Sequence, residues 1–150
     1  MKFTKICIVS LLVLNSSYSA AQSCQEGLYV QGSQACTASE DACPNKYLYQ
    51  VNCDGDQTQL KMLRASSTAK KYGYQAGDIR YQGNSSEGTF IQYFPTKQCG
   101  DPVRITTDAK LKFSNQSLEI SYQRHRYNET RCKVKSNSAI LKEITLLKVK

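Results

Sequence analysis

The sequence predicts a mainly β protein, an antiparallel barrel or sandwich that is stapled by disulfides and has a cysteine-rich N-terminal cap. The first observation is a series of short segments, from residue 46 onward, in which polar and apolar residues alternate between turn residues. The second is an even number of cysteines after an amino-terminal leader, which indicates a disulfide framework. These cysteines are Cys24, Cys36, Cys43, Cys53, Cys99 and Cys132.

Residues 1–21 have the features of a secretory signal peptide. Two lysines precede a short apolar run, and the small residues Ser19-Ala20-Ala21 follow it. The run is shorter than the roughly 20 residues that cross a membrane, so we expect no transmembrane span. Cleavage before Gln22 would remove Cys7 with the leader. We therefore expect a secreted or periplasmic protein.

The remaining chain, residues 22–150, has the usual size of a single domain, with a cap at 22–45 and strands over 46–150. It carries 18 basic and 12 acidic residues, a net charge of +6. Residues 22–60 have a net charge of −4, whereas residues 61–100 and 101–150 have +4 and +6. The basic part predicts affinity for an anionic glycan or an acidic protein face, with nucleic acid disfavoured. A role in solubility alone accounts for the same charge, and we favour that interpretation.

The expected elements begin inside the cap with a short strand at 28–30. A strand at 47–53 would place Tyr47, Tyr49, Val51 and Cys53 on one face, because side chains alternate along a strand. The residues Asp54-Gly55-Asp56 are typical of a hairpin turn. The return strand at 57–64 would then carry Leu60 and Met62 on one face.

Further strands are expected along the rest of the chain. Residues 78–82 and 89–94 form a pair around the polar loop 83–88, and 103–106, 110–113 and 118–123 follow. A turn at 127–130 leads into 131–135. The last segment, 139–149, fits a helical stripe as well as a strand, and we favour the strand.

The spacing of the cysteines argues against a metal site. The gaps between them are 12, 7, 10, 46 and 33 residues, with no C-x₂-C pair and a single histidine in the whole chain. We therefore expect structural disulfides, no metal and no cofactor. Six cysteines allow fifteen pairings. For Cys53, on a strand, a distant partner such as Cys99 or Cys132 is reasonable.

His125 is the only histidine available for acid–base catalysis. With Glu119 or Glu129 and an arginine, it would form a ribonuclease-like site in a small secreted hydrolase. The alternative is an exposed polar residue on a basic strand, since Leu118, Ile120 and Tyr122 would face the other side. We favour this alternative, and so predict a binding protein and not an enzyme.

The densest basic feature surrounds His125. A hairpin in this region would form a two-stranded basic ribbon, which favours phosphate or sulfate groups of an anionic glycan on an envelope or host surface. A solvated edge strand protected by charge accounts for the same residues, and we favour that interpretation. The ribbon contains Arg124, Arg126, Arg131, Lys133 and Lys135.

Part of the chain, residues 49–99, resembles the C-type lysozyme inhibitors. The segment 49–55 (Tyr-Gln-Val-Asn-Cys-Asp-Gly) is similar to their opening strand, and 68–72 (Thr-Ala-Lys-Lys-Tyr) to their inhibitory loop. The segments 81–83 (Tyr-Gln-Gly) and 87–90 (Glu-Gly-Thr-Phe) are similar to a later stretch, in which Gln82 stands where the family has lysine.

The resemblance implies an exported eight-stranded β-barrel that inhibits a protein, such as a lysozyme, by inserting a loop into its cleft. The inhibitory residues would be Thr68, Lys70, Lys71 and Tyr72, with Gln82 at the position of the lysine that the family inserts into its target. It also implies a Cys53–Cys99 bridge. The sequence thus predicts an exported binding or inhibitor protein, with the hydrolase and the glycan-binding protein as alternatives.

Overall fold

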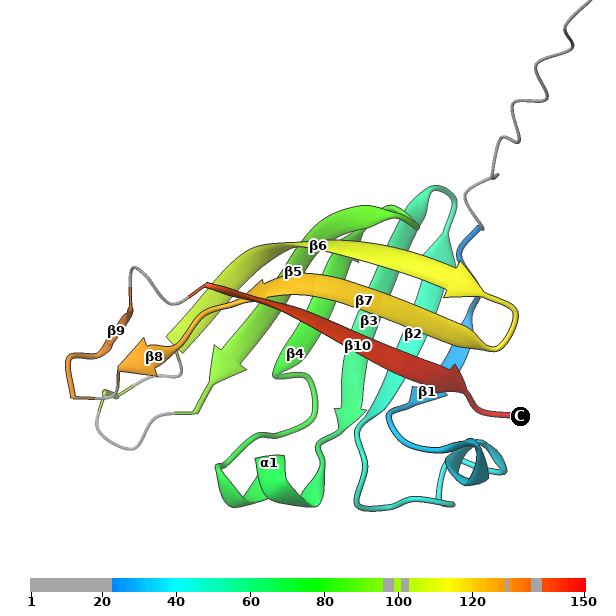
Figure 1. The fold of residues 1–150 in the computed structure, drawn as a ribbon, viewed down its shortest axis with the longest axis horizontal. Helices are drawn as coiled ribbons and strands as arrows, with labels where there is room; N and C mark the ends of the chain where they lie inside the picture. The colour runs from blue at the N-terminus through cyan, green and yellow to red at the C-terminus, as the bar shows by residue number, and fades with distance from the viewer. Residues whose placement is uncertain (1–22, 96–98, 101–102, 129, 136–138) are drawn as a thin grey trace, which may run out of the picture.

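The computed structural model describes residues 23–95, 99–100, 103–128, 130–135 and 139–150, so the expected leader lies outside the described residues. Within them, eight antiparallel strands form a closed barrel (Figure 1). The prediction of a mainly β, disulfide-stapled fold is confirmed, and the architecture is the barrel and not the sandwich. No helix in the described part of the chain is long and apolar enough to cross a membrane.

The barrel follows the order β1-β10-β7-β6-β5-β4-β3-β2, and a separate hairpin pairs β8 with β9. The elements are β1 (Gly27–Val30), η1 (Gln34–Thr37), β2 (Leu48–Asp54), β3 (Gln57–Arg64), α1 (Ser67–Lys71), β4 (Ile79–Gly83), β5 (Glu87–Phe94), β6 (Val103–Ser114), β7 (Ser117–Arg124), β8 (Tyr127–Asn128), β9 (Lys133–Val134) and β10 (Ile140–Lys148).

The two ends of the barrel are built differently. The turns β2–β3, β4–β5 and β6–β7 are short and lie at one end, which we call the turn end. The connections β1–β2, β3–β4, β5–β6 and β7–β10 are longer and leave the strands at the opposite end, the loop end. Figure 1 shows α1 and the β8–β9 hairpin beyond the loop end. Long connections at one end give that end the most freedom to carry a binding site.

Alternation of side chains along the strands fills the barrel. Tyr49 and Val51 of β2 are buried, as are Leu60 and Met62 of β3, whereas the residues between them are exposed. The predicted faces of these two strands are therefore confirmed. The inner faces of the other strands add the remaining core side chains, among them Tyr29, Tyr81, Phe90, Ala109, Leu111, Phe113, Leu118, Ile120, Tyr122 and Leu146.

Three local expectations were wrong. Residues 103–106 and 110–113 belong to one strand, β6, because the polar residues between them continue the alternation, with Ala109 facing inward. The expected loop at 68–72 is largely the helix α1. The expected strand at 131–135 is reduced to the two residues of β9. The strand at 139–149, favoured over a helix, is confirmed as β10.

The cap covers the outer wall of the barrel beside β1 and β2. Its Cys36 packs in a second buried cluster with Val30 and Leu48, whose side chains point outward from these strands. The backbone N–H of Lys150 donates to the carbonyl of Thr37 at 2.9 Å, which ties the cap to the end of the chain. The cap thus adds a small second core to the barrel.

The six cysteines form the bridges Cys24–Cys53, Cys36–Cys43 and Cys99–Cys132. The expected pairing of Cys53 with Cys99 or Cys132 is wrong. Cys53 lies near the turn end of β2, whereas Cys99 and Cys132 lie in connections at the loop end. Since bridged Cα atoms are normally 4.4–6.8 Å apart, the two ends are too distant to be joined. Cys53 binds the segment before β1 instead.

Candidate binding site at the loop end of the barrel

A cavity of about 410 Å³ opens among the inner faces of the strands near the loop end. This volume lies within the range of about 300–1,000 Å³ that is typical of small-molecule sites. Among the described residues that line it, seven side chains are aromatic and one is cationic. These are Tyr47, Tyr49, Tyr72, Tyr74, Phe90, Phe94, Tyr122 and Arg124.

The helix α1 forms one side of the cavity rim. The Ser66 hydroxyl accepts a hydrogen bond from the Ala69 N–H at 3.2 Å, which caps the start of the helix. The helix ends at Lys71, and Gly73, whose positive φ of 91° suits glycine, follows the C-cap residue Tyr72. Within this turn Ala69 faces the barrel interior and is buried, whereas Tyr72 remains 72% exposed.

Aromatic pairs continue from the interior to the rim. Phe90 and Tyr122 stack with ring centroids 4.4 Å apart, and Tyr74 meets Phe94 edge to face at 6.1 Å. Phe94 also stacks on Tyr127 of the β8–β9 hairpin at 6.4 Å. The Cys99–Cys132 bridge joins the β5–β6 connection to the chain between β8 and β9. The hairpin is therefore held beside the cavity rim by covalent and aromatic contacts.

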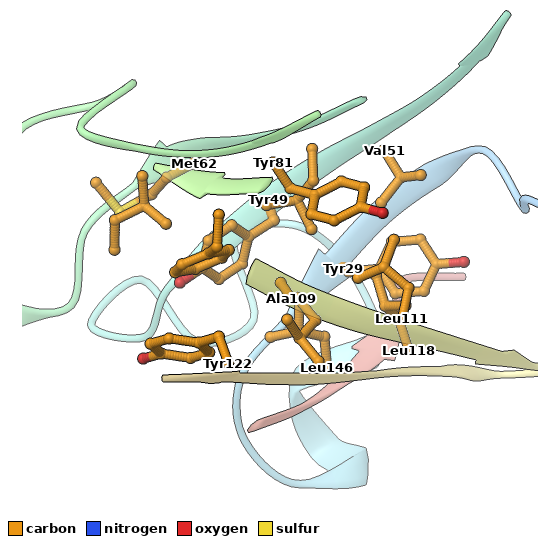
Figure 2. Close-up of a cluster of buried hydrophobic side chains, with 14 of the residues drawn as sticks. Tyr29, Tyr49, Val51, Met62, Tyr81, Ala109, Leu111, Leu118, Tyr122 and Leu146 are labelled. Carbon is orange, nitrogen blue, oxygen red and sulfur yellow. The ribbon is translucent and has the colours of Figure 1, made fainter. Parts of the chain in front are cut away.

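Four tyrosines of the barrel interior divide into two pairs. The hydroxyls of Tyr29 and Tyr81 donate to the carbonyls of Gln25 and Asn84, at 3.0 and 2.8 Å, at the turn end. In Figure 2 the hydroxyls of Tyr49 and Tyr122 point away from those of Tyr29 and Tyr81, toward the other side of the picture. These two residues line the cavity, and their hydroxyls form no hydrogen bond with any described residue. Their hydrogen-bonding capacity is thus available at the loop end.

Burial controls the acidity of these cavity tyrosines. It raises the pKa of Tyr49 far above its ordinary value, and the neighbouring Tyr47 and Tyr122 raise it further. Burial also raises the pKa of Tyr74 to about 12, and raises that of Tyr122. All these hydroxyls therefore stay protonated at neutral pH and can act as hydrogen-bond donors.

Arg124 lies on the rim of the cavity. It is the last residue of β7 and follows the inward-facing Tyr122 by two positions, so alternation directs it toward the inner face. It also borders a second depression of about 480 Å³, together with Tyr72, Tyr74 and Phe94. The two depressions are thus neighbours that share Arg124 and these three aromatic residues.

The residues expected in an inhibitory loop lie only partly together. Thr68, Lys70 and Lys71 are exposed on α1, and Tyr72 follows the helix. Gln82 is exposed on the outer wall of β4, close to the turn end of the barrel. The topology therefore separates Gln82 from the other four.

The expected basic ribbon contains a real hairpin, although a short one. Tyr127 pairs with Val134 and Asn128 with Lys133, and the Lys135 N–H donates to the Arg126 carbonyl at 3.0 Å. Arg131 lies in the turn between the two strands. Arg124 precedes this hairpin, at the end of β7. The side chains of Arg124, Arg126, Arg131 and Lys133 are all exposed.

The structure does not form the hydrolase site considered for His125 with Glu119. His125 is half-buried just beyond β7, beside Asp108 and Gln123 on the outer wall. Glu119 lies five residues before the end of β7, so roughly 17 Å of strand separates it from the end where His125 lies. Its carboxylate forms an ion pair with Lys112 at 3.7 Å. Glu129 lies outside the described residues.

The aromatic cavity itself was not predicted. A signal was present in the spacing of two between Tyr47 and Tyr49 and between Tyr122 and Arg124, which places each pair on one strand face. What the spacing did not show is that these faces meet at one end of a closed barrel. That depends on strand order and register, which are long-range features.

Comparison with known proteins gives no relative from which a function could be transferred. No family model matches the chain, and no curated protein or solved structure is significantly similar to it.

Proposed function

We propose that this protein is an exported binding protein that holds a small molecule in the aromatic cavity at the loop end of its barrel. The observation that carries the proposal is the contrast between the two ends. The interior tyrosine hydroxyls of the turn end are bonded to backbone carbonyls, whereas Tyr49 and Tyr122 offer theirs to the cavity. An apolar lining with a few convergent polar groups is the usual composition of a ligand site.

The barrel architecture is analogous to that of other eight-stranded barrels. Eight-stranded closed barrels have an interior that side chains fill or that holds one small ligand. Here the side chains fill the turn end, while the cavity occupies the loop end. The proposal concerns binding and not catalysis, because the described residues that line the cavity include no histidine, cysteine or carboxylate that could transfer a proton near neutral pH.

A fluorescent naphthalene probe without charge, N-phenylnaphthylamine, tests the proposal directly. We expect saturable binding of one probe per chain. The variant Gln92→Trp, on the inner wall of β5, should block the cavity, whereas Gln50→Trp, exposed on the outer wall of β2, should not.

The comparison of these two variants decides between a specific site and general surface binding. Both proteins must first show the same urea midpoint as the parent, which establishes that they are folded. If the probe does not bind, or if both variants bind it as the parent does, the cavity is not a ligand site.

The exposure of Tyr72 supports a second candidate function. A ring that is 72% exposed next to Lys70 and Lys71 is a suitable anchor for a protein partner. Inhibition of a lysozyme through this segment would slow the lysis of bacterial walls. The variant Tyr72→Ala should abolish that inhibition, and Tyr93→Ala, on the opposite side of strand β5 from the cavity lining, should preserve it. A parent protein that leaves lysis unchanged would refute this candidate.

A further inference from the structure

Arg124 has no acidic partner in the described part of the chain. The two ion pairs found there join Arg64 to Asp41 and Lys112 to Glu119, and neither involves Arg124. Its side chain is exposed but borders the cavity rim. A cation that faces an aromatic cavity without a counter-charge attracts an anion that enters the cavity.

The surroundings of Arg124 add hydrogen-bond donors to this charge. Burial raises the pKa of Tyr74 and of Tyr122, and the positive charge of Arg124 lowers both values in part. Tyr74, Tyr122 and Arg124 also line the same cavity. Asp78, the acid that acts on Tyr74, already accepts a hydrogen bond from the Gln75 N–H at 2.7 Å.

The other walls of the cavity select the remainder of the ligand. The stacked pair Phe90–Tyr122 and the edge-to-face pair Tyr74–Phe94 present ring surfaces on two sides. Such surfaces prefer a planar apolar or aromatic body. A highly charged ligand is disfavoured, because the described residues of the cavity lining provide one cation and no other charged side chain.

We propose that the ligand is a small organic anion, with a ring-shaped apolar body among the aromatic side chains and one carboxylate, sulfate or phosphate group bound by Arg124. This inference rests on the proposed function, because it assumes that the cavity is occupied. Tyr74 and Tyr122 donate to the same anionic group. The guanidinium provides the charge and a forked donor geometry that lysine lacks.

Two probes with the same ring system test this inference. Anilinonaphthalene sulfonate and uncharged N-phenylnaphthylamine differ chiefly in one sulfonate group. We expect the parent to bind the sulfonate about tenfold more tightly, as one charge-assisted hydrogen bond at a partly exposed site would give. Arg124→Met should remove this preference and change the affinity for the neutral probe less than about twofold. Arg124→Lys should restore only part of it.

A matched control removes a positive charge elsewhere. Arg104 is exposed on β6, paired with Tyr93 on the outer wall, so Arg104→Met should leave both affinities unchanged. If Arg104→Met and Arg124→Met weaken the sulfonate equally, net charge and not a site attracts it, and the inference fails. If the parent binds the neutral probe but shows no preference for the sulfonate, the inference fails while the proposed function stands. If neither probe binds, the proposed function fails as well.

Discussion

The contrast between the tyrosine pairs predicts that the same substitution, Tyr→Phe, costs different amounts of stability at the two ends of the barrel. Removing the hydroxyl of Tyr81 by Tyr81→Phe breaks a 2.8 Å hydrogen bond to the carbonyl of Asn84 in a fully buried side chain. We expect a loss of about 1–2 kcal/mol, because the net value of the bond is about 1 kcal/mol and the carbonyl is left with fewer partners. Tyr29→Phe should behave similarly, through its 3.0 Å bond to Gln25.

At the loop end the same substitution should cost much less. The hydroxyls of Tyr49 and Tyr122 have no bond to lose within the described residues, so Tyr49→Phe and Tyr122→Phe should change the stability by less than about 0.5 kcal/mol. The ring of each residue, and therefore its packing, is retained in phenylalanine. The expected difference between the two pairs is about 1 kcal/mol.

Urea unfolding of residues 22–150 with intact disulfides measures this difference. Fluorescence of the tyrosines or circular dichroism gives the midpoint and the slope m, and a constant m allows the midpoints to be compared directly. A difference of 1 kcal/mol corresponds to a melting-temperature shift of about 3–5 °C in a domain of this size. Equal losses in all four variants would refute the assignment, since Tyr49 and Tyr122 would then have partners inside the folded chain.

Three further predictions concern the frame of the barrel. Gly88→Ala should lower the free energy of unfolding in urea by more than about 2 kcal/mol, because the new Cβ would lie 2.7 Å from the Tyr81 hydroxyl and the Gly83 Cα. Gly55→Ala should cost about 1 kcal/mol, because Gly55 has a φ of 59° but open space around it, and equal costs for the two variants would contradict the close packing at Gly88. Burial raises the pKa of Tyr29, Tyr74 and Tyr81 to about 12, so the unfolded chain loses these protons at a lower pH than the folded chain does. The free energy of unfolding should therefore be constant below pH 10 and fall as the pH rises toward 12. A urea midpoint that stays constant between pH 10 and 12 would contradict the burial of these hydroxyls. In the chain-entropy model, replacing the Cys24–Cys53 bridge by serines should cost about 3.6 kcal/mol and replacing Cys36–Cys43 about 2.4 kcal/mol, because the two bridges close loops of 29 and 7 residues. Calorimetry of the two variants measures these losses, and a larger loss for the Cys36–Cys43 variant would contradict the model.

Local patterns were sufficient to predict the strands. The alternation of Tyr49 and Val51 against exposed neighbours, and the Asp-Gly turn at Gly55, depend only on residues close in sequence. The same logic failed at β6. Its twelve residues include Thr107 and Ala109, which are small or polar although they face inward, so the alternation was weak where the strand continued.

The disulfides and the cavity could not be predicted in this way. Whether Cys53 meets Cys24 or Cys99 depends on which end of the barrel each connection leaves, and that follows from the strand order. The helix α1 has only five residues, and the Ser66 cap is its main sequence signal. The expected inhibitory residues are also divided by topology, because Gln82 is on the outer wall near the turn end and Tyr72 is at the loop end.

The polar groups at the loop end conflict with what stability alone requires. A buried ring such as Tyr49, only 2% exposed, would be accommodated by phenylalanine without the cost of a desolvated hydroxyl. An arginine directed toward the inner face at position 124 likewise gains no ion pair from the described part of the fold. At the turn end, by contrast, the glycines of the Gly83–Gly88 pair leave room for the Tyr81 hydroxyl, which has its own acceptor. Local choices that oppose stability are expected where a protein binds something else, and Tyr49, Tyr122 and Arg124 line one cavity.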